Sequence, residues 1–431
     1  MHSNYRIQSV MGAVLLLCAI SLAGCSKDGG VELDENGDVI NPERGTQIVT
    51  GDPSLNQFLI TSKDEVVYTV DTQTGTETEI FSFENLTDLE LVADYDDGNI
   101  FVTADDNSMN ALNVATKSFV WDTPMLEYKF SSNGLSPTIC VDGICYASGG
   151  FGVVAAVDQI TGDLKWYYSS DPNGELDNVL SENGTPIVHN DKVYVFSDEG
   201  FISDLAPFIH VLDKQTGALL QKIELPFEVS GTPVFQGNTL YLPAKNLYAI
   251  AVESLEILWT LEANGMGTPA ISNGKLVVNA IPSGQGIKSA LYCVDIDSNS
   301  IIWQKDTGAD TLWSPLIVQN VVFSNYDKGS SFAFGTNGRL FALNLSSGEE
   351  LWYNDDVVID HSPVFANGRL FFGGHNLLGD GGTRENVGLL SMDANTGALV
   401  WLNPFFRLGS SLIPLVVAEN GVFGPSYYRG S

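Results

Sequence analysis

The chain of 431 residues carries 53 acidic and 20 basic residues, which gives a formal net charge of −33 at pH 7. Such a charge repels DNA and anionic lipid surfaces, so it excludes nucleic acid as a partner. The acidic residues are spread along the chain after residue 24. We interpret them as a means of solubility in a salty environment, with a basic partner surface as the alternative.

Residues 1–24 have the features of a secretory signal peptide. They contain one basic residue before an apolar core from Val10 to Leu22, which is too short to indicate a membrane span. The segment ends in Leu22-Ala23-Gly24-Cys25, which resembles the lipobox of bacterial lipoproteins. This resemblance implies that Cys25 is acylated as the first mature residue, and the lipid would anchor the protein in the bilayer. An ordinary signal peptide with an incidental cysteine is the alternative.

The residue after Cys25 indicates in which of the two bacterial membranes the lipid anchor would lie. Ser26 stands where an aspartate would resemble an inner-membrane retention signal, which favours the outer membrane. We expect the periplasmic side, with the cell surface as the alternative.

Residues 25–56 are predicted to form the acylated cysteine and a flexible acidic tether, because large apolar residues are rare there. Asp34, Asn36 and Asp38 have the spacing that opens a calcium loop, but Val39 replaces the expected glycine and Gly45 the expected glutamate. A solvated acidic linker therefore explains these residues better than a metal site.

From residue 57 to 431 the sequence repeats at the length of one propeller blade. The clearest copy has Asp158, a turn closed by Gly162, and Trp166 eight residues after the aspartate. Four copies keep this spacing with an aromatic end, and three are degenerate. They are Asn113/Trp121, Asp295/Trp303, Asn344/Trp352, Asp393/Trp401, Asp71/Glu79, Asp213/Gln221 and Ala251/Trp259.

A residue–proline pair between successive copies confirms the period. The pairs are Ser136-Pro137, Thr185-Pro186, Thr232-Pro233, Thr268-Pro269, Ser314-Pro315, Ser362-Pro363 and Ile413-Pro414. An apolar run, a turn such as Asn273-Gly274 and another apolar run follow, which is the pattern of a β-hairpin. Each unit is therefore predicted to hold four antiparallel strands, with the proline opening the innermost strand and the tryptophan on the outermost.

The chain ends also predict how the ring closes. Leu412 to Val417 has the pattern of the first half of a blade, whereas Val66 to Asp71 and Glu77 to Phe83 have the pattern of the second half. We expect one blade shared between the termini, which removes open sheet edges. Phe58 to Thr61 and Gly421 to Phe423 are the two candidates for its second strand.

The repeat residues have a physical purpose that suits this architecture. The aspartate accepts hydrogen bonds from turn amides, and the glycine permits the reversal into the next strand. The tryptophan offers a flat face to the neighbouring blade and an N–H for a backbone partner. The combination resembles the tryptophan-docking repeat of PQQ-type eight-bladed β-propellers, so we predict an all-β fold of this class.

Cysteine placement is consistent with an oxidising compartment. Cys140 and Cys145 flank a predicted two-residue turn, which places them opposite each other at a separation that a disulfide spans. We favour a structural disulfide over two buried thiols. Cys293 is expected to be a small core residue.

No catalytic constellation emerges from the sequence. Quinoprotein alcohol dehydrogenases share the repeat and hold PQQ with calcium, but the adjacent cysteine pair typical of that family is missing here. His189 and His361 stand beside the proline pairs, where they either approach the central channel or pack in the fold. We therefore predict no cofactor and no metal, and no enzyme.

Long connections between second and third strands are expected on one rim of the ring. We take this rim as the candidate binding face, with Phe201, Phe208, Phe332, Phe334 and His375 as its residues. The alternative is that these loops are tolerated insertions whose aromatic side chains cover blade ends.

The lipobox, the short tether and the propeller together resemble the BamB-type lipoproteins of outer-membrane β-barrel assembly. This resemblance implies a scaffold, monomeric within a complex, that binds the barrel-inserting subunit or nascent outer-membrane proteins. Two alternatives remain: a PQQ-dependent dehydrogenase, and a cell-surface lipoprotein that binds glycans or another protein.

Overall fold

A computed structural model describes most of the repeat region. The described residues are 58–63, 66–83, 94–104, 108–124, 136, 138–149, 153–170, 182–183, 186–198, 207–225, 229–262, 264–282, 289–308, 311–327, 338–359, 362–376, 387–406 and 415–417. The chain divides into the units Met1–Thr46 and Gln47–Ser431, and all described residues belong to the second. Every regular element in these ranges is a β-strand, and none of them contains a helix suited to cross a membrane.

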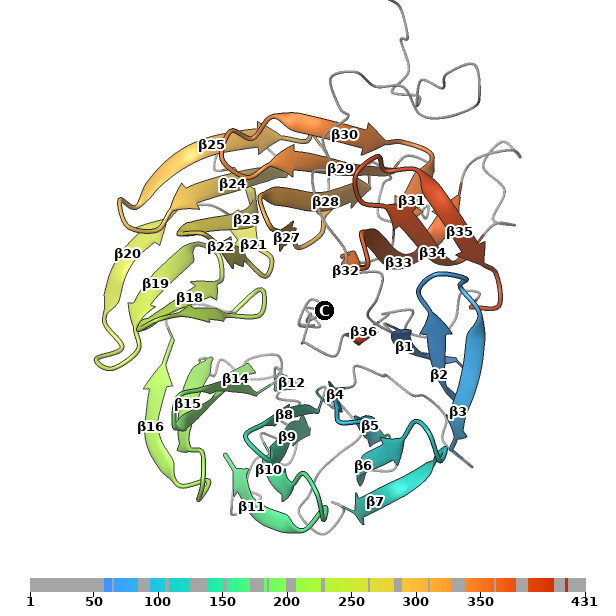
Figure 1. The fold of residues 1–431 in the computed structure, drawn as a ribbon. Coiled ribbons are helices and arrows are strands. Elements are labelled where there is room, and N and C mark those ends of the chain that lie inside the picture. The colour runs from blue at the N-terminus through green and yellow to red at the C-terminus, as the bar shows by residue number, and fades with distance from the viewer. Residues whose placement is uncertain are drawn as a thin grey trace, which may run out of the picture. The chain divides into compact units, whose positions relative to one another are not determined.

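Eight antiparallel sheets form a ring, with the first strand of each toward the centre and the last at the perimeter (Figure 1). The protein is thus an eight-bladed β-propeller, and we number its blades in chain order. Blade 1 comprises β36 (Leu415–Val417), β1 (Phe58–Lys63), β2 (Val66–Asp71) and β3 (Glu77–Ser82), and blade 2 comprises β4 (Asp94–Asp96), β5 (Asn99–Ala104), β6 (Ser108–Asn113) and β7 (Ser118–Pro124). Blade 3 comprises β8 (Ile139–Val141), β9 (Ile144–Gly149), β10 (Val153–Asp158) and β11 (Leu164–Ser169). Blade 4 comprises β12 (Glu182–Asn183), β13 (Ile187–His189), β14 (Lys192–Asp198), β15 (Phe208–Asp213) and β16 (Leu219–Glu224). Blade 5 comprises β17 (Val234–Gln236), β18 (Thr239–Pro243), β19 (Leu247–Ala251) and β20 (Ile257–Leu261), and blade 6 comprises β21 (Asn264–Met266), β22 (Ala270–Ser272), β23 (Lys275–Ile281), β24 (Ala290–Asp295) and β25 (Ser300–Asp306). Blade 7 comprises β26 (Thr311–Leu312), β27 (Leu316–Val318), β28 (Val321–Asp327), β29 (Gly338–Asn344) and β30 (Glu350–Asn354). Blade 8 comprises β31 (Val357–Ile359), β32 (Val364–Ala366), β33 (Arg369–Asn376), β34 (Val387–Asp393) and β35 (Leu399–Asn403).

The two ends of the repeat region share blade 1, as predicted. The C-terminal strand β36 pairs antiparallel with β1, with Phe58 opposite Val417 and Ile60 opposite Leu415. Strand β1 also pairs with β2, so it is the second strand of the blade. Of the two candidates for that position, Phe58 to Thr61 fills it.

The proline pairs explain an irregularity of the innermost strands. Pro186, Pro269, Pro315 and Pro363 directly precede the strands β13, β22, β27 and β32. In each of these blades a second short segment lies before the proline and pairs with the far end of the same second strand. Because proline has no N–H to donate to a ladder, it divides the innermost strand into two pieces.

The core is distributed among the seams between blades. Each of the eight clusters of buried apolar side chains joins residues of two neighbouring blades. Ile60 and Val67 of blade 1 meet Ile100 and Leu112 of blade 2, for example. A blade therefore buries its apolar faces only against its neighbours, which is why the ring must close.

Candidate functional site

The recurring turn is built by an acidic or amide residue in seven of the eight repeats, as the sequence predicts; Ala251 stands at this position in blade 5. In blade 3, Asp158 accepts hydrogen bonds from the backbone N–H groups of Ile160 and Thr161 at 3.0 and 3.1 Å. In blade 4, the Thr216 hydroxyl and backbone N–H donate to Asp213 at 2.7 and 2.8 Å, and these bonds lower the pKa of that carboxyl. The same arrangement occurs at Asp71, Asn113, Asp295, Asn344 and Asp393.

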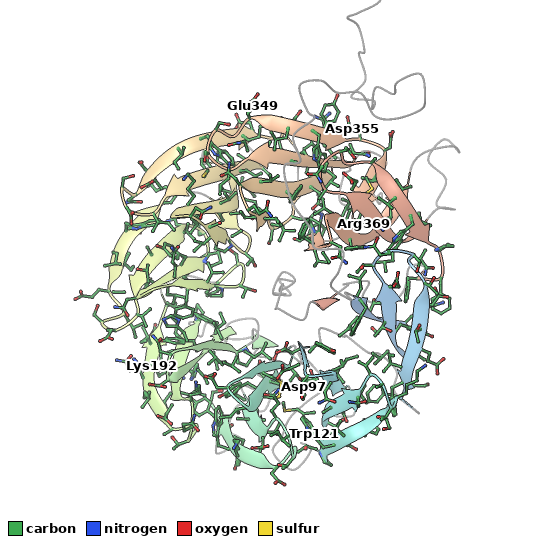
Figure 2. All side chains as sticks on the ribbon, in the orientation of Figure 1. Asp97, Trp121, Lys192, Glu349, Asp355 and Arg369 are labelled. Carbon is green, nitrogen blue, oxygen red and sulfur yellow. A yellow bond between two sulfur atoms is a disulfide. The ribbon has the colours of Figure 1, made fainter. Side chains whose placement is uncertain are left out.

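Tryptophans on the outer strands dock onto the following blade. Five of them, Trp259 of β20 excepted, donate the indole N–H to the backbone carbonyl of the residue after the neighbour's turn aspartate or asparagine. These bonds join Trp121 to Gln159 and Trp166 to Lys214 at 3.0 Å, Trp303 to Leu345 at 2.8 Å, Trp352 to Ala394 at 3.0 Å and Trp401 to Thr72 at 3.3 Å. Figure 2 shows Trp121 at the seam between blades 2 and 3. The tryptophans are therefore structural links between blades.

A glycine of the neighbouring turn receives each of these indole rings. Gly217 has a φ of +67°, and a Cβ built on it would lie 2.5 Å from the ring of Trp166. The corresponding pairs are Trp121 with Gly162, Trp303 with Gly348, Trp352 with Gly397 and Trp401 with Gly75. Glycine is needed here for two reasons, the left-handed backbone and the space that the indole occupies.

The predicted binding rim is described only at its base. The rim is formed by four longer connections, each between the second and third strand of a blade. The residues at which such a connection begins and ends lie opposite each other in the two strands, as Ser197 and Phe208 do. Phe208 is half-buried, with the Lys222 ammonium 3.9 Å from its ring centre and His210 at its edge. His375 lies in β33, opposite Val358 and Val387. Phe201, Phe332 and Phe334 lie outside the described residues, so this binding face stays a prediction.

The side chains of His189 and His210 are held within the fold. His210 is 1% exposed, and its Nδ1 lies 2.8 Å from the Tyr168 hydroxyl of blade 3. Burial, together with the nearby Lys222 ammonium, lowers the pKa of His210 to about 4, so the ring is neutral at pH 7. His189 stacks on Phe235 of blade 5, with ring centres 4.4 Å apart. His361 lies outside the described residues.

The cysteines occupy the positions that their spacing suggests. Cys140 and Cys145 are opposite each other in the hairpin of β8 and β9, and a disulfide joins them. Cys293 is a buried thiol, and burial raises its pKa to about 11. A thiol of this kind is neutral at pH 7 and a poor nucleophile. Cys25 and the tether of residues 25–56 lie outside the described residues.

Polar side chains of the inner strands link neighbouring blades, a feature that the sequence did not predict. Asp94 of β4 accepts a hydrogen bond at 2.6 Å from the backbone N–H of Cys140 in the next blade. Burial raises the pKa of Asp94, against the effect of this bond. Thr103 donates to the Ser136 carbonyl at 2.7 Å, and the Asn325 amide donates to the Ile359 carbonyl at 3.5 Å. A polar residue at an otherwise apolar position of a second strand is the signal that would have found Thr103 and Asn325.

The outer strands of blades 4, 5 and 6 expose aliphatic pairs, a second feature without a sequence-based prediction. Within the described ranges these pairs stand immediately before the tryptophan position, at Leu219 and Leu220 in β16, Ile257 and Leu258 in β20, and Ile301 and Ile302 in β25, with 39 to 56% of each residue exposed. A β-bulge places two outer residues opposite one partner at this point, which exposes both. Two adjacent aliphatic residues in a strand of period two are the corresponding signal.

Among the described residues, no group of three or more histidine, cysteine, aspartate or glutamate side chains could hold a metal ion. His210, Asp158, Asp213, Cys140 and Cys145 take part in seams, turns and a disulfide.

The fold and its docking repeat define the class, an eight-bladed β-propeller with tryptophan-linked blades. Residues 62–305 and 265–401 match the family model described as outer membrane protein assembly factor BamB, so the chain belongs to that family.

Individual relatives are distant. A tetrathionate hydrolase from Acidithiobacillus ferrooxidans is 24% identical over 344 residues, which are 72% of this chain and 64% of that protein. The outer membrane protein assembly factor BamB of Yersinia pestis is 24% identical over 239 residues, 50% of this chain and 56% of that protein. The chain therefore spans less than two thirds of the length of either relative.

Solved structures of the same fold include a BamB protein and an alcohol dehydrogenase. BamB from Moraxella catarrhalis superposes with a TM-score of 0.52 at 14% identity, over 77% of this chain and 92% of that one. A quinohemoprotein alcohol dehydrogenase from Comamonas testosteroni gives 0.54 at 15% identity, over 77% and 71%. At this identity the likeness shows the fold alone.

Proposed function

We propose that this protein is a non-catalytic scaffold that binds protein partners during assembly of outer-membrane β-barrel proteins. The observation that carries the proposal is the match of the BamB family model across residues 62–305 and 265–401, which span most of the propeller. The geometry supports it, because His189, His210, the acidic turn residues and the described cysteines are engaged within the fold. The partners would be the barrel-inserting subunit or nascent outer-membrane proteins.

The proposal includes an anchor on the periplasmic side of the outer membrane. Its support is the Leu22-Ala23-Gly24-Cys25 sequence followed by Ser26. A lipid on Cys25 would hold the propeller near the membrane without any contact between the acidic surface and anionic lipid. Metabolic labelling with a fatty acid tests this point: the wild type should incorporate label and the Cys25→Ala variant should not. Label retained by the variant would contradict acylation at this residue.

Capture of the native complex tests the function itself. The chain would be isolated from gently solubilised membranes through a C-terminal tag, and the associated proteins identified by mass spectrometry. Recovery of the barrel-inserting subunit in near-equal amounts is the expected result. A chain that is recovered without that subunit, even after crosslinking, would contradict the scaffold role. Susceptibility to protease on intact cells would instead favour a cell-surface binding lipoprotein.

An enzyme is the second candidate, because the tetrathionate hydrolase resembles a larger share of this chain than the Yersinia BamB does. Turnover of tetrathionate by the purified chain tests it directly. A PQQ-dependent dehydrogenase is less well supported. Among the described residues, His210 is neutral and sealed between blades and His189 is stacked on Phe235, so neither forms a basic cofactor pocket. Titration with PQQ, followed by its absorbance, is the check.

A further inference from the structure

Among the described strands, the outermost of each blade has one edge without a strand partner, and these edges differ in charge. A free edge presents unpaired N–H and C=O groups to any extended chain, and proteins commonly protect it with charged side chains. Most outer strands here carry at least one. These strands and their charged residues are β3 with Glu77 and Glu79, β7 with Asp122, β11 with Lys165, β16 with Lys222 and Glu224, β25 with Lys305 and Asp306, and β30 with Glu350.

Strand β20 of blade 5 lacks this protection. Its sequence, Ile257-Leu258-Trp259-Thr260-Leu261, contains no charged residue, and within its sheet it pairs only with β19. Ile257 and Leu258 are 51% and 56% exposed. The other uncharged outer strand is β35, whose most exposed apolar residue, Val400, is 42% exposed. The β20 edge is thus the most apolar and most accessible of the described outer edges.

The exposed apolar surface of β20 continues onto the outer strands of the two neighbouring blades. Outer strands β16 and β25 lie on either side of it in the ring (Figure 1) and each exposes a pair of aliphatic residues. The charges near β20 stand at its two ends, where Glu253 and Glu256 precede the strand and Glu262 follows it, all exposed. The surface therefore has an apolar centre between acidic ends.

We propose that the edge of β20 is a docking site for an extended amphipathic segment of another polypeptide, with apolar residues in its centre and lysine or arginine at its ends. Such a segment would add to blade 5 as a further strand, with main-chain hydrogen bonds along the edge and its apolar side chains against Ile257 and Leu258. The basic ends would face Glu256 and Glu262. This inference rests on the proposed role as a protein-binding scaffold and specifies where and what it binds.

Charge selects this occupant over a second copy of the same chain. Two copies paired through β20 would bring their glutamates together, and each carries a formal charge of −33. Like charges of this magnitude oppose association, whereas a basic partner is attracted and guided to the surface. An unfolded barrel strand with alternating apolar residues has the required shape, because it has not yet found its own strand partners.

The test uses the purified full chain and a fluorescent synthetic peptide that alternates valine and threonine between two pairs of lysines. Fluorescence anisotropy measures its affinity. In the Leu258→Lys variant binding should weaken about tenfold or more, because the change removes apolar contact and adds repulsion. The matched control is Thr78→Lys, an exposed residue at the same repeat position on β3, where binding should change by less than about twofold.

Two further measurements separate strand pairing from charge attraction. A peptide with methylated backbone nitrogens keeps its side chains but loses its donors, and it should bind markedly more weakly. Hydrogen exchange should show that the unmodified peptide protects the amides of residues 257–261. Equal losses in both lysine variants, equal binding of the methylated peptide, or protection confined to other strands would each overturn the inference. Ile257→Thr provides a second variant without a new charge, and unchanged affinity there would also count against it.

Failure of this inference differs from failure of the proposed function. A chain that captures the barrel-inserting subunit but shows no pairing at β20 overturns the docking edge and leaves the scaffold role in place. A chain that pairs the peptide at β20 but recovers no assembly subunit supports the docking edge and contradicts the assembly role. Dimers of the free chain that dissociate in the Leu258→Lys variant would identify a second copy as the occupant and overturn the proposal.

Discussion

The seams between blades are of two kinds, which are held together by different residues. Five seams have a tryptophan against a glycine, whereas the three seams between blades 1 and 2, 4 and 5, and 5 and 6 do not. The turn residue at all eight positions has a positive φ, and in the three exceptions it is Lys117, Leu255 or Asn299. The backbone conformation is therefore common to the repeat, and glycine occurs only where an indole needs the space.

The exceptional seams replace the indole with other contacts. Between blades 1 and 2, Glu79 stands eight residues after the turn aspartate of blade 1, but the β-bulge of β3 follows it, so Ile80 is the residue that packs into the seam. Lys117 donates to the backbone carbonyl of Glu79 at 2.7 Å. Between blades 4 and 5, Gln221 stands at the tryptophan position and Leu255 packs into the apolar cluster of the seam. Both seams that border blade 5 belong to this group, and blade 5 also has the apolar free edge. The side of the ring with the least regular docking is thus the side proposed to bind a partner.

Removal of a buried docking tryptophan should have the largest effect on stability. Trp352 is 1% exposed and lies between Phe323 and Gly397. Its replacement by alanine leaves a cavity and an unpaired carbonyl at Ala394, so we expect a loss of about 3–5 kcal/mol in the free energy of unfolding. Trp259→Ala is the matched control, because this tryptophan is only partly buried and the turn position of the next blade holds Asn299 instead of glycine. Urea denaturation measures both, and equal losses would show that the glycine partner is irrelevant.

The seam between blades 3 and 4 should also respond to pH. The folded pKa of His210 is lowered to about 4, below the unfolded value of about 6.5, so the unfolded chain takes up a proton first as pH falls. Stability should therefore decline from pH 6.5 and level off below about pH 4, by roughly 3 kcal/mol in total.

Comparison with His210→Gln isolates this contribution. Glutamine is neutral at every pH and can still accept a hydrogen bond from Tyr168. The turn aspartates Asp158, Asp213 and Asp295 have lowered pKa values, so their contributions are lost only below this window. Urea denaturation at pH 7 and at pH 4.5 should show a smaller decline for the variant. Parallel declines would assign the pH dependence to other groups.

Alanine in place of a docking glycine should lower the free energy of unfolding by less than removal of the indole does. It should lower it by more than alanine at a turn where the added Cβ meets no other atom. Gly217→Ala places a Cβ against Trp166 in a left-handed backbone, with an expected loss of about 2–3 kcal/mol. Gly143→Ala tests the backbone contribution alone, because Gly143 has a φ of +78° and no atom within 4 Å of the added Cβ. It should lose about 1 kcal/mol. Thermal or urea unfolding measures both variants. Equal losses in the free energy of unfolding would mean that the indole moves aside to make room for the methyl group.

How much the sequence predicts follows from what repeats in it. Asp158, Gly162 and Trp166 recur at fixed spacing, so the blades, the turns and the ring closure follow from the amino-acid pattern alone. The links of Asp94 and Thr103 across the inner seams do not, because each depends on the register between two blades and occurs without a repeated pattern. The exposed edge of β20 escapes prediction for a similar reason. Its exposure depends on the bulge and on its place at the end of the sheet, which only the strand order reveals.

The smallest effect is expected where a regular docking pair is built into an exceptional seam. Glu79→Trp alone would place an indole on the exposed face of β3, because the β-bulge of this strand follows residue 79 and Ile80 faces the seam. Lys117→Gly alone would lose the bond to the Glu79 carbonyl. Together they recreate the sequence of the tryptophan–glycine pair, and we expect the bulge to move before residue 79, as in the other blades, which brings the indole to the Val114 carbonyl. The double variant should therefore exceed the sum of the single effects by about 1–2 kcal/mol in a double-mutant cycle of urea unfolding. A coupling near zero would show that this seam has its own geometry and that the regular pair cannot be transferred to it.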